Sequence, residues 1–542
     1  MNWTPNPTDR RALVNGRIHT MASPDDTVDA IAWDGDTITA TGDADVRAWA
    51  AQHDVALEDL EGRTVVPGFV DAHTHFLHVG VKHTRPDLRG ATSRAEALDR
   101  VAAFLDDHPE GAVIAEGWDE DGWPDGAPTK ADADRLAPDR PLVLRRICGH
   151  KAIANEAALP LIRNIWDDDT LVNMETGVLL EQPSLYLNEA LPVPPEQLDA
   201  ALQESCAIAH RLGVTTVGDY EQAPYREALL RAARRGTLTV RVACSIYVQQ
   251  LESAISEGFQ TGRRGHGPDD GDGPGTSPWV QDAGLKVFLD GSLGGHTAYL
   301  RKPYCDHAGH GMPNWTPQEV HEFFQKAHRH GIQIHAHAIG DAAIDQGLDG
   351  FEALERPTDE PTDGQTMNGR AVTGEPLRHR FEHYEIVHDD QVVRTAQLGI
   401  VASSQPNFVG VWSSKGGMYE ERLGERFLLN NRFRSFKNAG LRLAFGSDGM
   451  PFGAPYGLQA AVDHPVEAER LTPAEAVWHY TAEAAWSLHL HDVGQLRPGW
   501  KADLLILDQP NLDAPPKTWT IQETISGGVS RGGNTEPILR EA

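Results

Sequence analysis

Lysine is scarce in this sequence: its 542 residues include ten lysines, although Lys and Arg together number 48. Acidic residues number 79 and are spread along the chain, so the formal net charge is −31. A nucleic-acid partner needs a basic surface, so this charge balance argues against one. An acidic, lysine-poor surface is typical of a halophilic protein kept soluble in concentrated salt. An ordinary acidic cytosolic enzyme is the alternative.

Cysteines and long hydrophobic runs are also few. The cysteines at positions 148, 206, 244 and 305 form no CxxC pair, which predicts a reducing compartment and no thiolate metal site. No apolar run approaches the roughly 18 residues of a membrane span, and the first twenty residues lack a signal-peptide pattern. We therefore expect a soluble, cytoplasmic protein that acts on a small molecule, without a membrane partner.

The middle of the chain alternates apolar strand patterns with amphipathic helix patterns. The strand patterns include GVTTVGDY, LTVRVACSIY, GLKVFLDG, GIQIHAHAIGD, LRHRFEHYE, GIVASSQP and LRLAFGSDG. Repeated strand–helix units favour a parallel sheet, and a count near eight favours a closed (β/α)8 TIM barrel over a doubly wound fold. Short strand patterns at both chain ends, such as ALVNGRIHT and ADLLILD, predict a small β-sandwich formed from the two ends.

We therefore predict an α/β fold with three parts. The TIM barrel occupies residues 67–490, and the β-sandwich is formed by residues 1–66 and 491–542. A subdomain is inserted after the first barrel strand, at about residues 80–191. Two segments rich in Gly, Pro and Asp, 261–278 and 355–376, are predicted to be loops or disordered.

One lysine lies inside an apolar run. Lys286 belongs to LKVFL, a pattern typical of a buried strand. Burying an ammonium group is unfavourable, so such a lysine is usually paired, neutral or chemically altered. One interpretation is an ion pair with Asp290 in the same segment.

Metal-binding residue types stand where several predicted strands end. His73 and His75 are two residues apart on a strand, so both side chains point to one face and suit a single ion. His337, His383 and Asp448 end three later strands. Barrels keep their chemistry at the carboxyl ends of their strands, so this recurrence predicts a metal site.

The His-x-His pattern alone is weak evidence, because it occurs four times in this histidine-rich chain. The pair His328/His330 lies near the end of a predicted helix, and the pair His489/His491 follows the last barrel strand pattern. We interpret both pairs as structural.

Five motifs together carry a family resemblance: PGFVDAHTH, LKVFLDGSLGGHTA, HAHAIGDAAID, LRHRFEHYE and LAFGSDGMPFG. The set resembles the metal-dependent amidohydrolase superfamily and is closest to its amidohydrolase-3 branch, which contains N-substituted formamide deformylases. The resemblance covers nearly the whole chain. It implies hydrolysis of a carbon–nitrogen bond other than a peptide bond, in an amide, formamide or cyclic amide, by metal-activated hydroxide.

The resemblance also implies metal ligands. His73 and His75 would bind one divalent ion, and His337 and His383 a second. Zinc is the expected metal, and iron, manganese and nickel suit the same ligands. His335 shares a strand face with His337, so the pattern leaves open which of the two is the ligand. We favour His337 because it directly precedes AIGD.

Two further roles follow from the resemblance. Lys286 matches a lysine that reacts with CO₂ to form a carbamate bridging two metal ions. A buried lysine has a lowered pKa, which makes its neutral amine available for that reaction. Asp448, also counted among the metal ligands, would hold the hydrolytic water and shuttle its proton.

Four residues are assigned to the substrate pocket. Trp118 and His150 stand where the branch places pocket-lining residues, and Asp290 and His296 belong to the motif around Lys286. That motif departs from its relatives, which often carry Ser-Arg where this chain has Gly295 and His296. The substrate of a relative is therefore not transferred directly to this chain.

Two alternatives stay open at this point. A one-metal heterocycle deaminase needs His73, His75, His337 and Asp448 but no lysine carbamate. A regulatory or binding member of the fold would lack turnover, although the intact ligand set argues against that interpretation. Family members are often dimers, so the resemblance is compatible with a homodimer, and the sequence itself leaves the oligomeric state open.

Overall fold

A computed structural model describes residues 10–533 and 537, apart from residues 121, 148, 150, 181, 186, 222, 266–276 and 355–368. His150 and most of the two predicted loop segments lie outside the described residues. The chain forms two compact units, one made of Met1–Phe76 with Cys206–Ala542 and the other of Leu77–Ser205. Within the described part of the chain, no helix is both long enough and apolar enough to cross a membrane.

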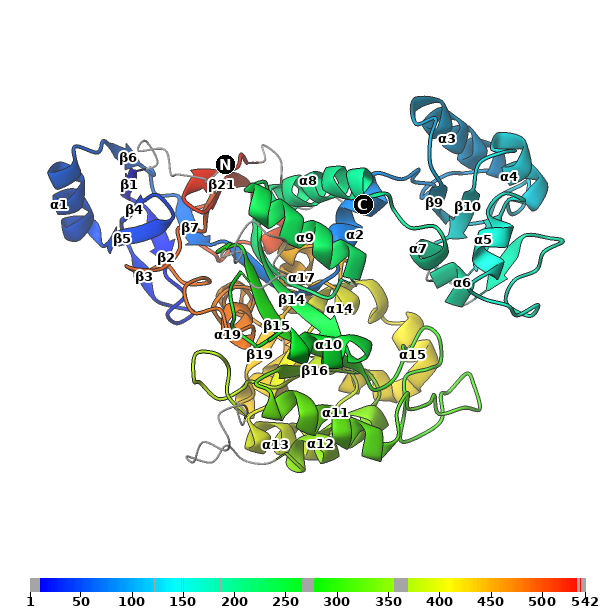
Figure 1. The fold of residues 1–542 in the computed structure, drawn as a ribbon. Coiled ribbons are helices and arrows are strands. Elements are labelled where there is room, and N and C mark those ends of the chain that lie inside the picture. The colour runs from blue at the N-terminus through cyan, green and yellow to red at the C-terminus, as the bar shows by residue number, and fades with distance from the viewer. Residues whose placement is uncertain are drawn as a thin grey trace. The chain divides into compact units, whose positions relative to one another are not determined.

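The first unit contains a parallel eight-stranded sheet in the order β19-β18-β17-β16-β15-β14-β13-β8, which confirms the predicted TIM barrel (Figure 1). The two end strands meet where the backbone N–H of Asp448 donates to the carbonyl of His73, at 2.7 Å. Most strand residues are buried on both faces, as expected of a parallel sheet covered by helices. The strands are β8 (Phe69–Thr74), β13 (Val214–Asp219), β14 (Arg241–Tyr247), β15 (Val280–Phe288), β16 (Gln333–Ala338), β17 (Arg380–His383), β18 (Val401–Ser404) and β19 (Leu443–Phe445).

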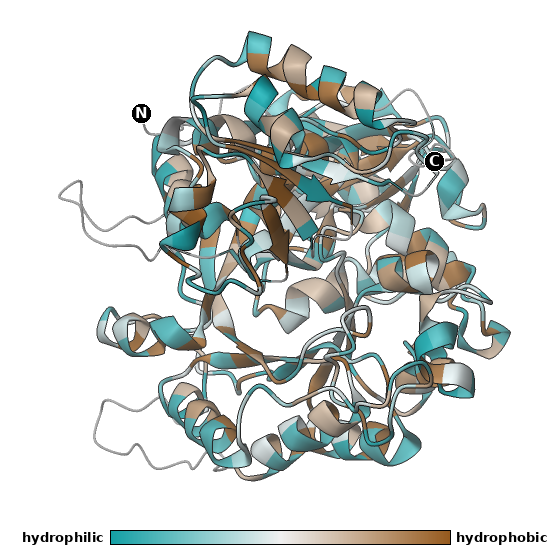
Figure 2. Cartoon of the chain, turned by 90° about the vertical axis from the view of Figure 1, so that its right-hand side faces the viewer, coloured by the Kyte–Doolittle hydropathy of each residue, from teal (hydrophilic) through white to brown (hydrophobic). Residues whose placement is uncertain are grey.

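The barrel helices form because their apolar residues recur at helical spacing behind good caps. Helix α11 (Pro317–Arg329) begins with a capping box between Thr316 and Glu319 and buries Val320 and Phe324. Figure 2 shows the same alternation of brown and teal faces on many helices. The other long helices of this unit are α9 (Ala223–Arg235), α12 (Asp341–Glu352), α13 (Asp389–Leu398) and α17 (Ala454–Val462), and shorter ones are α10 (Leu251–Ser256), α14 (Pro406–Trp412), α15 (Met418–Leu423), α16 (Phe433–Asn438), α18 (Pro473–His479) and α19 (Ala482–Ser487).

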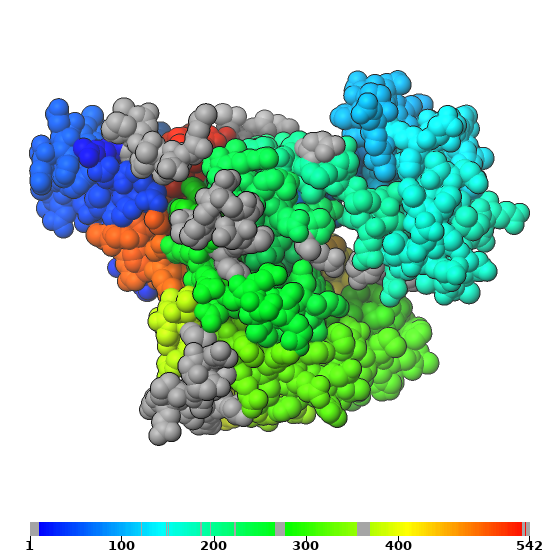
Figure 3. All heavy atoms as spheres, viewed as in Figure 1, coloured from blue at the N-terminus to red at the C-terminus, as the bar shows by residue number. Residues whose placement is uncertain are grey.

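The first unit also contains the predicted β-sandwich, built from both chain ends. One sheet has the order β5-β4-β1-β6, and the other, β22-β21-β20-β7-β2-β3, mixes strands from the two ends. Leu13 and Trp33 pack with Leu504 and Ile506 in a single core, and the blue and orange segments lie side by side in Figure 3. The strands are β1 (Arg11–Val14), β2 (Arg17–His19), β3 (Thr27–Val28), β4 (Ile31–Asp34), β5 (Thr37–Thr41), β6 (Leu57–Asp59), β7 (Thr64–Pro67), β20 (Leu504–Leu507), β21 (Ile521–Ser526) and β22 (Val529–Ser530), and helix α1 spans Asp43–His53.

The second unit holds a four-stranded sheet in the order β12-β11-β10-β9 with a hydrophobic core on each face. The compact unit, Leu77–Ser205, is longer than the predicted insertion of about 80–191. Helix α8 (Pro195–Arg211) begins inside it, which extends the unit beyond the predicted end. Its other elements are β9 (Val113–Trp118), β10 (Leu142–Arg146), β11 (Lys151–Ala154), β12 (Val178–Leu180), α3 (Arg94–Asp107), α4 (Lys130–Leu136), α5 (Leu159–Arg163), α6 (Gln182–Leu185) and α7 (Leu187–Ala190), and α2 (Phe76–His83) leads into it.

Candidate active site

The predicted metal ligands of the barrel meet at the carboxyl ends of its strands. His73 lies near the end of β8, and His75 follows that strand. His337 lies on β16, His383 ends β17, and Asp448 follows β19. Parallel strands of a barrel share one carboxyl-terminal edge, so residues distant in sequence come together there.

Asp448 and the first two histidines form the tightest part of the site. Asp448 Oδ1 lies 3.5 Å from His75 Nε2 and 3.7 Å from His73 Nε2. Lys286 Nζ lies 3.3 Å from the same His73 nitrogen. A carboxylate oxygen and an amine nitrogen therefore converge on His73 Nε2.

His337 and His383 complete the group. Their ring centroids are 4.3 Å apart, and the His73 and His383 centroids are 5.0 Å apart. Among the described residues, the buried Nδ1 atoms of His337 and His383 have no hydrogen-bond partner. The His337 Nε2 atom lies 3.1 Å from the carbonyl oxygen of Gly291 and can donate its proton to it. The Nδ1 atom of His337 then carries a lone pair that can bind a metal ion.

These observations fit a metal centre. One ligand atom each from His73, His383 and Asp448 lies within 4.8 Å of the others. Burial holds the pKa of His73 and of His383 well below the ordinary value. The neighbouring Lys286 ammonium lowers the pKa of His73 further, and His337 lowers that of His383. Burial lowers the pKa of His337 to about 3. Neutral imidazoles are the form that binds metals, so this set is ready to act as ligands.

Two of these residues have backbone conformations that non-glycine residues rarely adopt. The φ angle is 71° at His383 and 52° at Asp448. Left-handed conformations of this kind carry strain, which is maintained where the surrounding structure fixes the backbone. Both turns end a barrel strand and bring the side chain toward the other ligands.

Lys286 is fully enclosed in the barrel. Its Nζ lies over the rings of Tyr220 and Phe288, at 4.5 and 4.9 Å from their centroids. Burial lowers the pKa of Lys286 to about 8. The Asp290 carboxylate accepts hydrogen bonds from the backbone N–H groups of Tyr299, Ile339 and Gly340. The interpretation of Lys286 as the ion-pair partner of Asp290 is therefore wrong.

The two histidines of HAHAIGD have different environments. His335 Nδ1 lies 2.8 Å from the Tyr220 hydroxyl, and its Nε2 lies 3.0 Å from Gln333 Oε1. Both of its ring nitrogens are occupied inside the barrel. His337 keeps a nitrogen that faces no hydrogen-bond partner among the described residues, so the geometry favours His337 as the ligand.

The three tentative pocket residues within the described part of the chain have different environments. Trp118 is fully buried in a hydrophobic core of the second unit, where its Nε1 donates to the Leu144 carbonyl, so its pocket assignment is wrong. Asp290 is buried and binds backbone N–H groups, and its Oδ1 lies 3.6 Å from His337 Nε2. Burial raises the pKa of Asp290 to about 7. His296 lies 3.1 Å from the Asp306 carboxylate, in a loop after β15.

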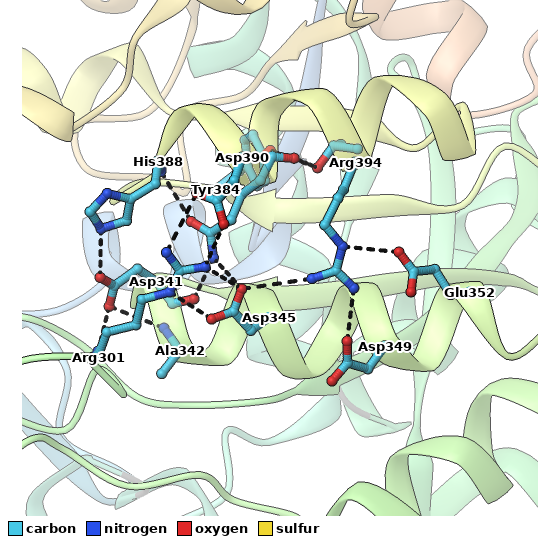
Figure 4. A network of polar contacts seen from close by, with 12 residues as sticks. Arg301, Asp341, Ala342, Asp345, Asp349, Glu352, Tyr384, His388, Asp390 and Arg394 are labelled. Carbon is cyan, nitrogen blue, oxygen red and sulfur yellow. Dashed lines mark hydrogen bonds and ion pairs between the residues drawn. The ribbon is translucent and has the colours of Figure 1, made fainter.

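The loop after β15 is fixed by a polar network outside the barrel (Figure 4). Arg301 binds the carboxylates of Asp345 on α12 and Asp390 on α13, at 2.6 and 3.0 Å. Its backbone N–H donates to Asp341, whose other oxygen lies 2.9 Å from His388 Nε2. The loop is thereby attached to the two helices that follow the strands of His337 and His383.

The sequence analysis missed three functional residues in the barrel interior: Tyr220, Arg380 and Glu382. Glu382 Oε2 lies 2.5 Å from His73 Nδ1, and Glu382 Oε1 accepts from the Tyr220 hydroxyl at 2.9 Å. Arg380 donates to both Glu382 oxygens. Burial raises the pKa of Glu382, but Arg380 and His73 lower it by more, so that it lies well below its usual range. A carboxylate on the far nitrogen of a metal-binding histidine fixes its tautomer and orientation.

The alternation Arg380-x-Glu382 was the sequence signal for this network. Two charged residues at a period of two in an otherwise buried strand must face the same side of that strand. Such charges stay buried only when they are paired.

The sequence profile of the Amidohydrolase family matches residues 56–531. The chain belongs to the amidohydrolase family. This amidohydrolase is 28% identical over 528 residues to the putative amidohydrolase YtcJ of Bacillus subtilis. The aligned region covers 91% of this chain and 93% of YtcJ. It is 26% identical over 547 residues to the N-substituted formamide deformylase of Arthrobacter pascens. That aligned region covers 92% of this chain and 94% of the deformylase. The resemblance inferred from the five motifs is confirmed.

Solved structures agree with this assignment. The crystal structure of an uncharacterized metal-dependent hydrolase from Pyrococcus horikoshii matches this amidohydrolase with a TM-score of 0.78 and 27% identity. The match covers 94% of this chain and 99% of that one. The barrel and the terminal sandwich therefore belong to a fold that occurs in metal-dependent hydrolases.

Proposed function

We propose that this amidohydrolase cleaves a carbon–nitrogen bond, other than a peptide bond, in an amide, formamide or cyclic amide. The observation that carries the proposal is the meeting of four histidines, one buried lysine and one aspartate at the carboxyl end of a single barrel. The similarity to an N-substituted formamide deformylase supports the same substrate class.

His73 and His75 would hold one divalent metal ion, and His337 and His383 a second. Metal ions bound there would activate water near neutral pH and polarise the substrate carbonyl. Zinc is the proposed metal because imidazole and carboxylate ligands suit it.

Lys286 is proposed to be a carbamate. Its amine nitrogen would form a bond to the carbon of CO₂ and lose one proton, which gives a side chain with one negative charge and two oxygen atoms. The neutral amine needed for this step is favoured by burial, and Nζ already lies 3.3 Å from His73 Nε2. A carbamate would add anionic ligand atoms between the two histidine pairs.

Asp448 is the proposed proton carrier. Its Oδ1 lies between the Nε2 atoms of His73 and His75, and its side chain is partly exposed. Oδ1 would accept a proton from the attacking water and deliver it to the leaving nitrogen. The backbone of Asp448 is left-handed, and its N–H donates to the carbonyl of His73.

The test is turnover of zinc-loaded protein on N-substituted formamides, linear amides, cyclic amides and amino-substituted heterocycles. We expect release of an amine or opening of a ring, and a loss of at least about 1,000-fold in kcat for Asp448→Asn. Ammonia release from the heterocycles alone would replace the proposal by deamination. No turnover on any panel member, at full metal content, would favour a binding role.

A further inference from the structure

One aromatic side chain is exposed beside the candidate metal ligands. Phe288 is the last residue of β15, and it is 37% exposed in a strand whose other residues are all buried. It lies two residues after Lys286, so both side chains point to the same face of the strand. The Lys286 Nζ lies 4.9 Å from the centroid of the Phe288 ring.

Phe288 packs directly against a candidate ligand. It is paired in register with His337 on β16, and the two ring centroids are 4.9 Å apart. One side of the Phe288 ring is therefore packed against the candidate ligand His337. The exposed part of the ring lies at the carboxyl end of the barrel, where a substrate must approach the same ligands.

A second aromatic ring extends this surface. Tyr247, the last residue of β14, stacks beside Phe288 with centroids 6.0 Å apart and an interplanar angle of 19°. The Tyr247 hydroxyl donates to the carbonyl of Tyr220, so its ring is held in place. Two nearly parallel aromatic rings therefore lie at neighbouring strand ends, next to Lys286 and His337.

We propose that Phe288, with Tyr247, is the specificity-determining surface of the site and binds a flat aromatic group attached to the scissile amide. This inference rests on the proposed function, because it takes the metal centre as the point where the amide is held. Aromatic groups favour offset-stacked or edge-to-face contacts with such rings. A small aliphatic substituent would cover little of the exposed ring and gain little from it.

Hydroxamates test the proposal without turnover, because they anchor on a metal centre through two oxygens. The probes are benzohydroxamate and acetohydroxamate, and their affinities for the zinc-loaded full-length protein are measured by calorimetry. We expect benzohydroxamate to bind at least about 10-fold more tightly than acetohydroxamate. Phe288→Leu should lose about 5- to 10-fold in benzohydroxamate affinity and change acetohydroxamate affinity by less than about 2-fold.

Two further variants make the result specific. Phe288→Tyr keeps the ring and should keep the preference for benzohydroxamate. Phe323→Leu removes a partly buried phenylalanine on α11, where it packs against Trp315, and should change neither affinity. Thermal unfolding of each variant establishes that it is folded.

The outcomes separate this proposal from the proposed function. Equal affinities of the two hydroxamates for the wild-type protein, or an unchanged preference in folded Phe288→Leu, would overturn the aromatic surface and leave the metal centre intact. Failure of both probes to bind zinc-loaded protein would overturn the metal centre, and the aromatic proposal with it.

Discussion

His73 and Glu382 share a hydrogen bond of 2.5 Å inside the barrel, where neither side chain reaches solvent. Because Nδ1 donates to the carboxylate, the Nε2 lone pair of His73 points toward Lys286 and Asp448. The same carboxylate neutralises the buried Arg380 guanidinium. Glu382 therefore links the stability of the barrel to the orientation of a candidate ligand.

Glu382→Gln is expected to weaken both properties. Removing the charge leaves Arg380 buried without an anion, which should lower the free energy of unfolding by about 3–5 kcal/mol. Loss of the orienting carboxylate should lower metal affinity by about 10- to 100-fold. Chemical denaturation and chelator competition measure the two effects. Glu352→Gln, which alters an exposed ion pair with Arg394, is the control and should change stability by less than about 1 kcal/mol. Unchanged metal affinity in a folded Glu382→Gln would contradict the orienting role.

Lys286→Met should keep the fold and be unable to form the proposed carbamate. Methionine retains the apolar stem of the lysine, whereas it cannot react with CO₂. We expect a loss of at least one metal ion per chain by elemental analysis and a fall in kcat of about 1,000-fold or more. Lys286→Ala should regain part of its activity with millimolar propionate, a small carboxylate that fits the vacated volume. The exposed Lys326→Met, which removes an ion pair with Glu252, serves as the control. Full metal content in Lys286→Met would contradict the carbamate.

The buried ion pair between Arg241 and Asp503 should stabilise the junction of the barrel and the sandwich. Arg241 begins β14, Asp503 precedes β20, and their nearest atoms are 2.7 Å apart. Asp503→Asn leaves the guanidinium buried and unpaired, so we expect a loss of about 3–5 kcal/mol in urea denaturation. Asp508→Asn, which alters a surface contact with Arg63, should lose less than about 1 kcal/mol. Equal losses in the two variants would contradict this account.

His464 should make stability depend on pH. Burial lowers its folded-state pKa to about 4, whereas an unfolded histidine has its ordinary value of 6.5. Below pH 6.5 the unfolded chain binds a proton at His464 that the folded chain does not bind. The folded state is therefore favoured fully above pH 6.5, and this advantage falls as the pH decreases toward 4. The stability difference between wild type and His464→Gln should therefore fall by up to about 1.4 kcal/mol per pH unit in this window. The other titratable groups are the same in both proteins, so their contributions to the pH dependence cancel in this difference. A difference that is constant from pH 7 to pH 5 would be incompatible with this pKa.

Salt should stabilise the protein. With 79 acidic and 48 basic residues, repulsion between carboxylates outweighs ion pairs such as Arg301–Asp345. Raising the salt from about 0.1 to 1 M shortens the screening length from about 10 to 3 Å. We expect Tm in KCl to rise by several degrees over this range. A Tm that falls with salt would show that the surface ion pairs dominate and would remove the halophilic interpretation.

The sequence predicted the barrel, the two-ended sandwich and the strand-end positions of the candidate ligands, because these depend on local patterns. His73 and Asp448 each follow a strand pattern that can be recognised without knowledge of the fold. The choice between His335 and His337 depended on hydrogen bonds to Tyr220 and Gln333, which the strand pattern does not encode.

Errors arose where a residue type was informative but its neighbours were unknown. Trp118 stands in a motif typical of the family, yet its ring fills the core of the second unit. Asp290 has the charge expected of a partner for Lys286, yet three backbone N–H groups occupy it. Glu382 was missed because two of its partners, His73 and Tyr220, are distant from it in the sequence.

The pairing of β7 with β20 has a consequence for the order of folding. Leu504 and Pro67 are register partners, although more than 400 residues separate them. At ribosomal rates of about 5–20 residues per second, β20 emerges roughly 20 to 90 s after β7. During that interval the N-terminal strands have an open hydrogen-bonding edge, which is a site for association with other nascent chains. The sheet edge at β7 is therefore completed only after the whole barrel sequence has been made.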